Sequence, residues 1–260
     1  MVESLSDQQL KQVLAPLVAN PETLSFEPVR KGVANQVYHA RAEGVSWAVK
    51  ILGPASFNAV DYNTVHQLQQ QLASLQVAPT VIDVNLQQRI WVEEWVDTPS
   101  LSRIDTSLLA QALARIHHLD VKAPTLALLP CWQHYLEQLP AIRTRQFIKE
   151  RDKLALVIAQ SSHYQDFCLC HNDLSLAHLV GNNHDIVIDW EYVATGNRYF
   201  DLAACALINE LDEMQCQALS DEYAEATGIE PSQVYHKLQA FLPVVDFTNR
   251  LWQAAADYQC

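Results

Sequence analysis

Several features that often reveal the class of a protein are missing from this 260-residue sequence. No apolar run is long enough to span a bilayer, since the most apolar stretch, Leu202 to Ile208, is far too short. The first residues, MVESLSDQQLKQVL, contain neither the basic segment nor the apolar segment of a signal peptide. These absences predict a cytoplasmic protein that does not cross a membrane.

Cations are scarce as well, with 17 Lys and Arg against 30 Asp and Glu and a formal net charge of −13. An acidic surface repels phosphate backbones and anionic lipids, so neither nucleic acid nor a membrane surface is an expected partner. The six cysteines form no C-x-x-C pair and are too sparse for a disulfide scaffold. We therefore expect reduced thiols and no zinc site.

The apolar fraction of 49% is ample for a core, and the length suits one catalytic unit built from two lobes. The chain changes character near residue 98. Before it, alternating apolar residues predict a small sheet, preceded by a helix capped by Ser6 and Gln9 and interrupted by a second helix. After it, the pattern is helical, broken by short strand-like pieces within and beside residues 171–191. The expected strands are 23–29, 36–42, 45–51, 81–86 and 90–96, and the expected helices are about 59–75, 107–119, 132–138, 142–160, 199–210, 212–227 and 231–258.

The segment HNDLSLAHLVGNNHDIVIDWE (171–191) gathers carboxylates and histidines around a short apolar run. Together with the later DLAACA, it resembles the pattern H-x-D-x-x-x-x-N, then I-D-W/F-E, then D-L-A of the choline kinase, thiamine kinase and aminoglycoside phosphotransferase group. KGVANQVYHA, WAVKIL, VAPTVID, VEEWVD and LARIHHL extend the resemblance over most of the chain in the same order. The region after residue 195 resembles the bacterial thiamine kinases most closely.

This resemblance implies an α+β, protein-kinase-like fold. A β-rich, nucleotide-binding lobe (1–97) would precede a helical catalytic and substrate lobe (98–260), with ATP in the cleft between them. It also implies phosphoryl transfer from ATP to a small alcohol, which requires alignment of the hydroxyl and neutralisation of phosphate charge. Asp173 would accept or orient the hydroxyl proton, Asp189 would bind Mg²⁺, and His171 would mainly brace the catalytic loop.

Two positions depart from the family pattern. His178 stands where the family has an asparagine as second metal ligand, and an imidazole suits Mn²⁺ or Zn²⁺ better than Mg²⁺. The helix glutamate that normally aims the nucleotide-binding lysine is also missing, since Val65 stands at its expected position; we expect Asp61 to substitute for it. Both departures leave open an alternative, a pseudokinase that binds nucleotide without turnover.

The nucleotide contacts follow from the resemblance. Lys50 would bind the α- and β-phosphates. Gly32 would let the backbone approach phosphate, whereas Asn35 would fix the hairpin beside it. The main chain of Glu94 and Val96 would meet adenine.

The acceptor pocket is expected around Glu191, Trp190 and Trp252, because aromatic faces beside a carboxylate suit a cationic substrate. Thiamine is the first expected acceptor, and choline or another amino alcohol the next. A metallophosphoesterase is a weaker alternative suggested by GNNHD, although its expected D-x-H and G-H-x-H motifs are absent. The oligomeric state and the metal stoichiometry stay open at this point.

Overall fold

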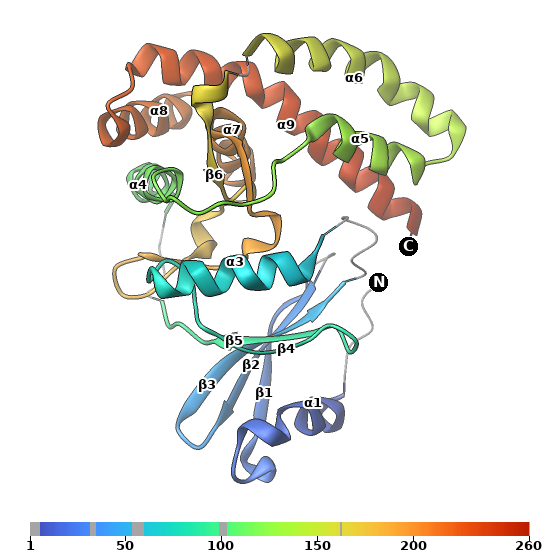
Figure 1. Cartoon of the computed structure of the whole chain (residues 1–260), viewed down its shortest axis with the longest axis vertical. Coiled ribbons are helices and arrows are strands. Elements are labelled where there is room, and N and C mark those ends of the chain that lie inside the picture. Colours follow the sequence, from blue (N-terminus) through green and yellow to red (C-terminus); the bar gives the residue numbers. More distant parts are fainter. Residues whose placement is uncertain (1–5, 32–34, 54–59, 99–102, 162, 260) are drawn as a thin grey trace. The chain divides into compact units, whose positions relative to one another are not determined.

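The computed structural model describes residues 6–31, 35–53, 60–98, 103–161 and 163–259. The chain divides into two compact units, Met1–Asp97 and Thr98–Cys260, here called unit 1 and unit 2. The boundary lies where the sequence changes from strand-like to helical patterns. Figure 1 labels the elements of both units.

Unit 1 is an antiparallel five-stranded sheet with the strand order β1-β2-β3-β5-β4. Its first helix begins after Ser6, and the predicted capping box between Ser6 and Gln9 is confirmed. The elements are α1 (Asp7–Leu14), β1 (Ser25–Lys31), β2 (Asn35–Ala42), β3 (Val45–Leu52), α3 (Tyr62–Ser74), β4 (Val81–Asn85) and β5 (Ile90–Glu94).

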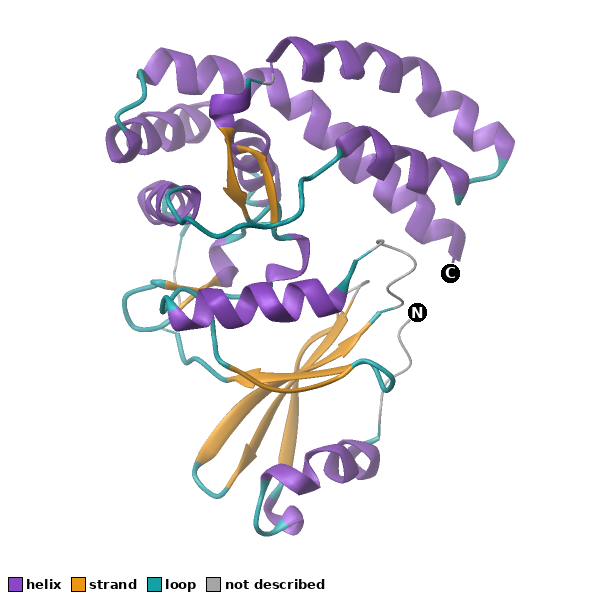
Figure 2. Cartoon of the chain, viewed as in Figure 1, coloured by secondary structure: helices purple, strands orange, loops and turns teal. Residues whose placement is uncertain are grey.

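The two faces of this sheet bury different helices. Side chains alternate along a strand, so Val49 and Ile51 of β3 pack with Leu10 and Leu14 of α1. On the other face, Leu52 of β3, Val65 of α3 and Trp91 of β5 form a second buried cluster. Figure 2 shows the two helices against opposite faces of the sheet. Lys50 lies on the α3 face, as its place between Val49 and Ile51 predicts.

Unit 2 is mainly helical, and its long last helix packs against four others. Two short antiparallel strand pairs, β6 with β9 and β7 with β8, hold the segment between the helices. The elements are α4 (Thr106–His117), α5 (Leu128–Glu137), α6 (Ala141–Ser161), β6 (Phe167–Cys170), β7 (Leu179–Val180), β8 (Ile186–Val187), β9 (Ala194–Asn197), α7 (Arg198–Ile208), α8 (Glu213–Thr227) and α9 (Pro231–Gln259).

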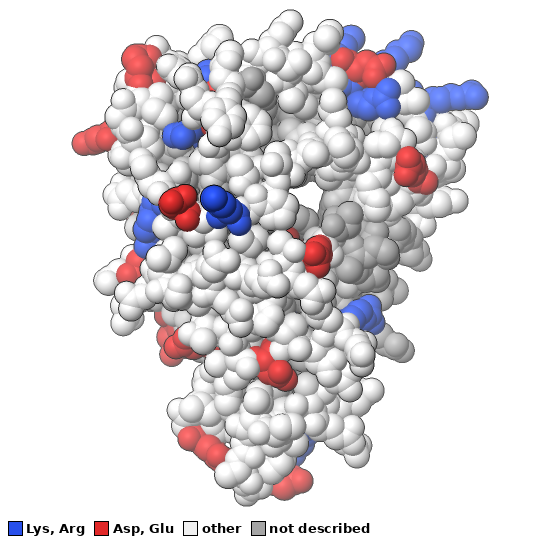
Figure 3. All heavy atoms as spheres, in the orientation of Figure 1, with Lys and Arg blue, Asp and Glu red and all other residues white. Residues whose placement is uncertain are grey.

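Charged side chains are spread thinly over the face shown in Figure 3. The main group of basic side chains lies at the upper right, over α6, whose sequence includes Arg143, Arg145, Lys149, Arg151 and Lys153. None of the helices in the described part of the chain has the length and apolar character needed to cross a membrane.

Candidate active site

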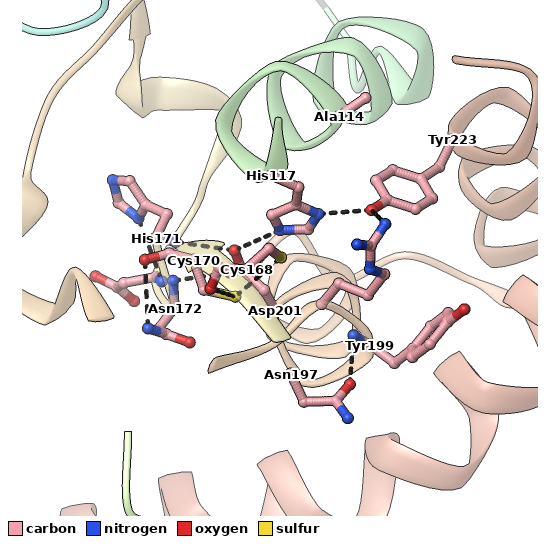
Figure 4. Close-up of polar contacts among 12 residues, drawn as sticks. Ala114, His117, Cys168, Cys170, His171, Asn172, Asn197, Tyr199, Asp201 and Tyr223 are labelled. Carbon is pink, nitrogen blue, oxygen red and sulfur yellow. Dashed lines mark hydrogen bonds and ion pairs between the residues drawn. The ribbon is translucent and has the colours of Figure 1, made fainter. Parts of the chain in front are cut away.

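The segment that follows β6 is anchored by Asp201, in the first turns of α7. Its fully buried carboxylate accepts hydrogen bonds from the backbone N–H groups of His171 (2.8 Å) and Asn172 (2.7 Å). It also contacts Nε2 of His117, the last residue of α4, at 3.0 Å, and Tyr223 Oη lies 2.6 Å from the other nitrogen of that ring (Figure 4). Asp201 therefore ties two helices to the loop.

The charge of Asp201 is stabilised despite its burial. Burial raises the pKa of this carboxyl, but the hydrogen bond from His117, the attraction of that ring and the hydrogen bond from the backbone N–H of His171 outweigh burial, so the pKa lies below its ordinary value. The carboxylate form, which accepts all three hydrogen bonds, is thus favoured.

His171 braces the loop through both ring nitrogens. Nε2 donates to the carbonyl of Ile188 at 3.0 Å, and Nδ1 accepts the N–H of Asp173 at 3.3 Å, which fixes the neutral tautomer. The ring is completely buried. One partner is the backbone N–H of Asp173 and the other is the carbonyl of Ile188, which directly precedes Asp189. One imidazole therefore holds the backbone at or next to both aspartates. This geometry supports bracing rather than proton transfer by His171.

The backbone is unusual at Asn172 and Asp189, two of the non-glycine residues of this segment that have a positive φ. Asn172 has φ +65° and Asp189 has φ +70°, in the left-handed region that non-glycine residues seldom occupy. Asn172 is held there by its side-chain amide, which donates to the carbonyl of Tyr192 at 2.8 Å. Such backbone conformations persist only where the surroundings enforce them, and they concentrate at functional sites.

Asp173, His178 and Asp189 come together in unit 2. One possible ligand atom from each lies within 4.8 Å of the others. A single 3-10 turn, Leu176–His178, carries the histidine back toward Asp173, and the pairing of β7 with β8 brings Asp189 alongside. Nε2 of His178 lies 3.7 Å from Oδ2 of Asp189.

The other ring nitrogen of His178 suggests its tautomer. Nδ1 lies 2.9 Å from the carbonyl oxygen of Asp173, and the N–H of Ser175 lies farther away, at 3.3 Å. A carbonyl oxygen can only accept, so the shorter contact requires a proton on Nδ1 and leaves the lone pair on Nε2, facing Asp189. In a metal-binding histidine, a backbone carbonyl usually accepts the N–H of the ring nitrogen that does not bind the metal.

Asn209, just after α7, is a loop anchor that the sequence did not reveal. Its side-chain oxygen accepts the N–H of Leu176 at 2.8 Å, and its amide donates to the carbonyls of Leu174 and Cys205. A lone asparagine beyond a helix carries no motif, so only the folded chain identifies it.

In unit 1, Lys50 forms an ion pair with Glu93 of β5, with Nζ 3.0 Å from Oε1. The hypothesis that Asp61 supplies the partner carboxylate is wrong. Asp61 caps α3 instead, accepting hydrogen bonds from the N–H of Asn63 (3.1 Å) and from the hydroxyl of Thr64 (2.7 Å). An acidic residue just before a helix is favoured at the cap, which explains its real role.

The remaining nucleotide-binding predictions concern loop and strand-end residues. Gly32 lies outside the described residues. Asn35 accepts the N–H of Gly53 at 3.0 Å, so it closes the open end of the β2–β3 pair; its predicted role in the hairpin between β1 and β2 stays a prediction. The N–H of Glu94 donates to the carbonyl of Thr80 at 2.8 Å. Adenine binding by the main chain of Glu94 and Val96 stays a prediction.

Among the predicted acceptor residues, Trp190 requires correction. It is 1% exposed, its indole N–H donates to the carbonyl of Val187 at 2.7 Å, and its ring packs against His171. It therefore supports the loop that carries Asp173 and presents no open aromatic face. Glu191 and Trp252 are partly exposed, and the charge of Glu191 is close enough to contribute to a raised pKa of Tyr135, which burial mainly causes.

A second group of possible metal-binding atoms consists of His117, Cys168 and Cys170. Sγ of Cys168 lies 3.9 Å from Sγ of Cys170, and that contact is the main reason why the pKa of Cys168 falls to about 7. Both nitrogens of His117, however, are engaged by Asp201 and Tyr223. This group therefore belongs to the hydrogen-bond network that anchors the loop.

Comparison with known proteins matches residues 25–241 to the model of the phosphotransferase enzyme family. One curated relative, an uncharacterised protein of Metamycoplasma hominis, is 26% identical over 119 residues, which is 44% of this chain. The match spans only 23% of the length of that relative.

Solved structures share the fold over almost the whole chain. Plasmodium vivax ethanolamine kinase is 15% identical, with 96% of this chain and 82% of that chain covered and a TM-score of 0.80. The choline kinase LicA of Streptococcus pneumoniae is 20% identical, with coverages of 97% and 91% and a TM-score of 0.76; LicA has also been solved in complex with AMP. An aminoglycoside-3'-phosphotransferase of type VIII is 19% identical, with coverages of 88% and 98% and a TM-score of 0.63. The predicted α+β, protein-kinase-like fold is confirmed.

Proposed function

Because this chain belongs to the phosphotransferase enzyme family, we propose that it is an ATP-dependent kinase of a small alcohol. The acceptor we propose first is thiamine, and the next is choline or another amino alcohol. The observation that carries the proposal is the cluster of Asp173, His178 and Asp189 on a loop held by Asp201 and His171.

Asp173 is the proposed proton acceptor. Its carboxylate is partly exposed, while its backbone N–H is fixed by His171, so the side chain can reach a substrate hydroxyl from a rigid base. A positioned carboxylate orients the hydroxyl and takes its proton as the oxygen attacks the γ-phosphorus, while the bond from that phosphorus to the bridging oxygen breaks and ADP leaves. Asp173 therefore aligns the nucleophile, and the surrounding network keeps that alignment.

The cluster also fits a divalent cation. Two carboxylates offer the oxygen ligands that Mg²⁺ prefers, and the lone pair on Nε2 of His178 adds a nitrogen ligand that Mn²⁺ accepts more readily. Asp189 and His178 would hold the ion, and a bound cation would neutralise phosphate charge. We propose Mg²⁺ as the ordinary cofactor, with Mn²⁺ able to replace it.

Unit 1 supplies the proposed nucleotide contacts. Lys50 is charged, nearly buried and directed by an ion pair, which suits an ammonium group that binds the phosphates of ATP. The missing helix glutamate was one of the two reasons for considering a pseudokinase. Glu93 removes that reason, since the lysine does have a carboxylate beside it. The acceptor is proposed to be cationic because Glu191 adds a partly exposed carboxylate next to the loop.

The test is a screen of acceptors for ATP-dependent phosphorylation. Purified protein would be incubated with ATP and with thiamine, choline, ethanolamine, homoserine or an aminoglycoside, in Mg²⁺ or Mn²⁺, and the phosphorylated product would be identified by mass spectrometry. We expect one of the cationic alcohols to be phosphorylated, thiamine first. ATP binding without any phosphorylated product, in either metal, would contradict the proposal.

A further inference from the structure

We propose that Glu93 is the positioning residue of the nucleotide-binding lysine, and that Gln69 of α3 holds Glu93 in place. The carboxylate that aims Lys50 thus comes from a neighbouring strand and not from the helix. This inference rests on the proposed function, because it assigns Lys50 to ATP.

The contacts around Glu93 occupy both of its carboxylate oxygens. Oε1 accepts from Nζ of Lys50 at 3.0 Å. Oε2 accepts from the side-chain amide of Gln69 at 2.8 Å and from the indole N–H of Trp91 at 2.9 Å. The Glu93 side chain is 1% exposed and that of Lys50 is 10% exposed. Neither group can be hydrated fully, so each depends on the other for stabilisation of its charge.

The direction of the lysine follows from this arrangement. Lys50 and Glu93 lie on the α3 face of the sheet, on the adjacent strands β3 and β5. A flexible four-carbon side chain has many rotamers, and a fixed carboxylate selects those that place the ammonium group near it. Gln69 and Trp91 in turn hold Oε2 of Glu93 by hydrogen bonds, which limits the rotamers that its side chain can adopt. Glu93 acts through Lys50 and need not touch ATP.

Gln69 provides the link to the helix. It is 2% exposed, and its amide also donates to the carbonyl of Pro79 at 3.3 Å. An amide is neutral and can only hold a carboxylate, whereas a glutamate at the same place would itself attract the lysine. The helix therefore keeps its connection to the lysine through one intermediate side chain.

The decisive experiment exchanges the two side chains. Glu93→Gln removes the carboxylate. The double variant Gln69→Glu with Glu93→Gln places a carboxylate on the helix instead, so that a carboxylate and an amide still face each other. Asp61→Ala is the matched control, because it removes an acidic residue of unit 1 that caps α3. The dissociation constant of an ATP analogue would be measured for each protein by calorimetry, together with the KM for ATP and for the acceptor.

We expect Glu93→Gln to weaken ATP binding and raise the KM for ATP roughly ten- to a hundredfold, the scale of a lost hydrogen bond to a charged group. The KM for the acceptor should stay unchanged. The double variant should recover at least half of the lost affinity for ATP, compared on a logarithmic scale of the dissociation constant. Asp61→Ala should bind ATP as the wild type does. Each protein would be checked by circular dichroism, so that loss of folding is recognised.

Two other outcomes have separate meanings. If the wild type binds ATP and Glu93→Gln, correctly folded, binds it equally well, Glu93 does not position the lysine and the inference is wrong. If the double variant recovers nothing, the charge of Glu93 is not the property that matters, which also overturns it. If the wild type binds no ATP at all, it is the proposed function that fails.

Discussion

At the residue scale, His178 is the position where this chain departs most clearly from the family pattern. The structure places its Nε2 toward Asp189 and engages its Nδ1 with the carbonyl of Asp173. An asparagine could keep the second contact through its amide and offer an oxygen to the metal. In the proposed metal site, this position would therefore supply a nitrogen ligand in place of an oxygen ligand.

We predict that His178→Asn increases turnover with Mg²⁺ relative to Mn²⁺ by about tenfold, the scale on which a changed ligand environment alters a metal site. The reason is that a hard oxygen ligand matches Mg²⁺ better than a nitrogen does. The ratio of the initial rates in the two metals would measure the effect.

His184→Asn is the matched control, because His184 lies in the same hairpin and its Nδ1 contacts the carbonyl of Leu179. This variant should keep the metal preference of the wild type. If His178→Asn leaves the ratio of rates unchanged as well, His178 is not a metal ligand.

The sequence predicted individual residues unevenly. Asp173, Asp189 and His171 stand within one ordered motif, so their proximity could be expected before the fold was known. Glu93 could not be found in this way, because its link to Lys50 depends on the pairing of β3 with β5 and on the reach of Gln69. The prediction that Trp190 contacts the substrate is wrong because an aromatic residue in a motif does not reveal which way its ring points.

At the element scale, the helices and the five strands of unit 1 lie close to their predicted ranges. For example, α8 was expected at 212–227 and covers Glu213–Thr227. The sequence predicts short strand-like pieces within and beside residues 171–191 but not the bounds of β9, because Ala194–Asn197 has no alternating apolar pattern and only its pairing with β6 defines the strand. Local periodicity thus predicts long elements, whereas short ones depend on their partners.

Asp201 anchors the loop after β6 to α7, and replacing this residue tests how much that anchorage contributes to stability. We predict that Asp201→Asn lowers the free energy of unfolding by about 3 kcal/mol at neutral pH, as expected for breaking a buried, paired network. Asparagine keeps one acceptor oxygen but places its amide against a backbone N–H of His171 or Asn172. Urea denaturation of both proteins would measure the difference, and Asp185→Asn, at an exposed turn position, should behave like the wild type.

The pH dependence of this loss has a definite sign. The folded-state pKa of Asp201 lies below the ordinary value of 3.8, so the folded protein binds the proton less readily than the unfolded chain does. The stabilisation is therefore fully present above about pH 4 and is lost as the pH falls through the lower folded-state pKa. The difference between wild type and Asp201→Asn should shrink in acid; a difference that stays constant down to pH 3 would contradict the charged state of Asp201.

At the scale of the whole molecule, the two units carry different parts of the proposed chemistry. Unit 1 contributes a buried lysine held by a carboxylate, an amide and an indole. Unit 2 contributes a carboxylate and histidine cluster on a loop tied to α4 and α7. The order of motifs along the chain predicted this division, whereas the identity of the acceptor depends on side-chain packing in unit 2 that no motif encodes.

The most direct test of the account is the rate of acceptor phosphorylation by the wild type and by Asp173→Asn, at saturating ATP and with the acceptor found in the screen. Asp189→Ala would accompany them as the variant expected to lose metal-dependent nucleotide binding. If Asp173 aligns the hydroxyl and accepts its proton, kcat should fall by about a hundredfold or more in Asp173→Asn, while the dissociation constant of ATP stays nearly the same. An Asp173→Asn variant that phosphorylates the acceptor at the wild-type rate would contradict the central claim.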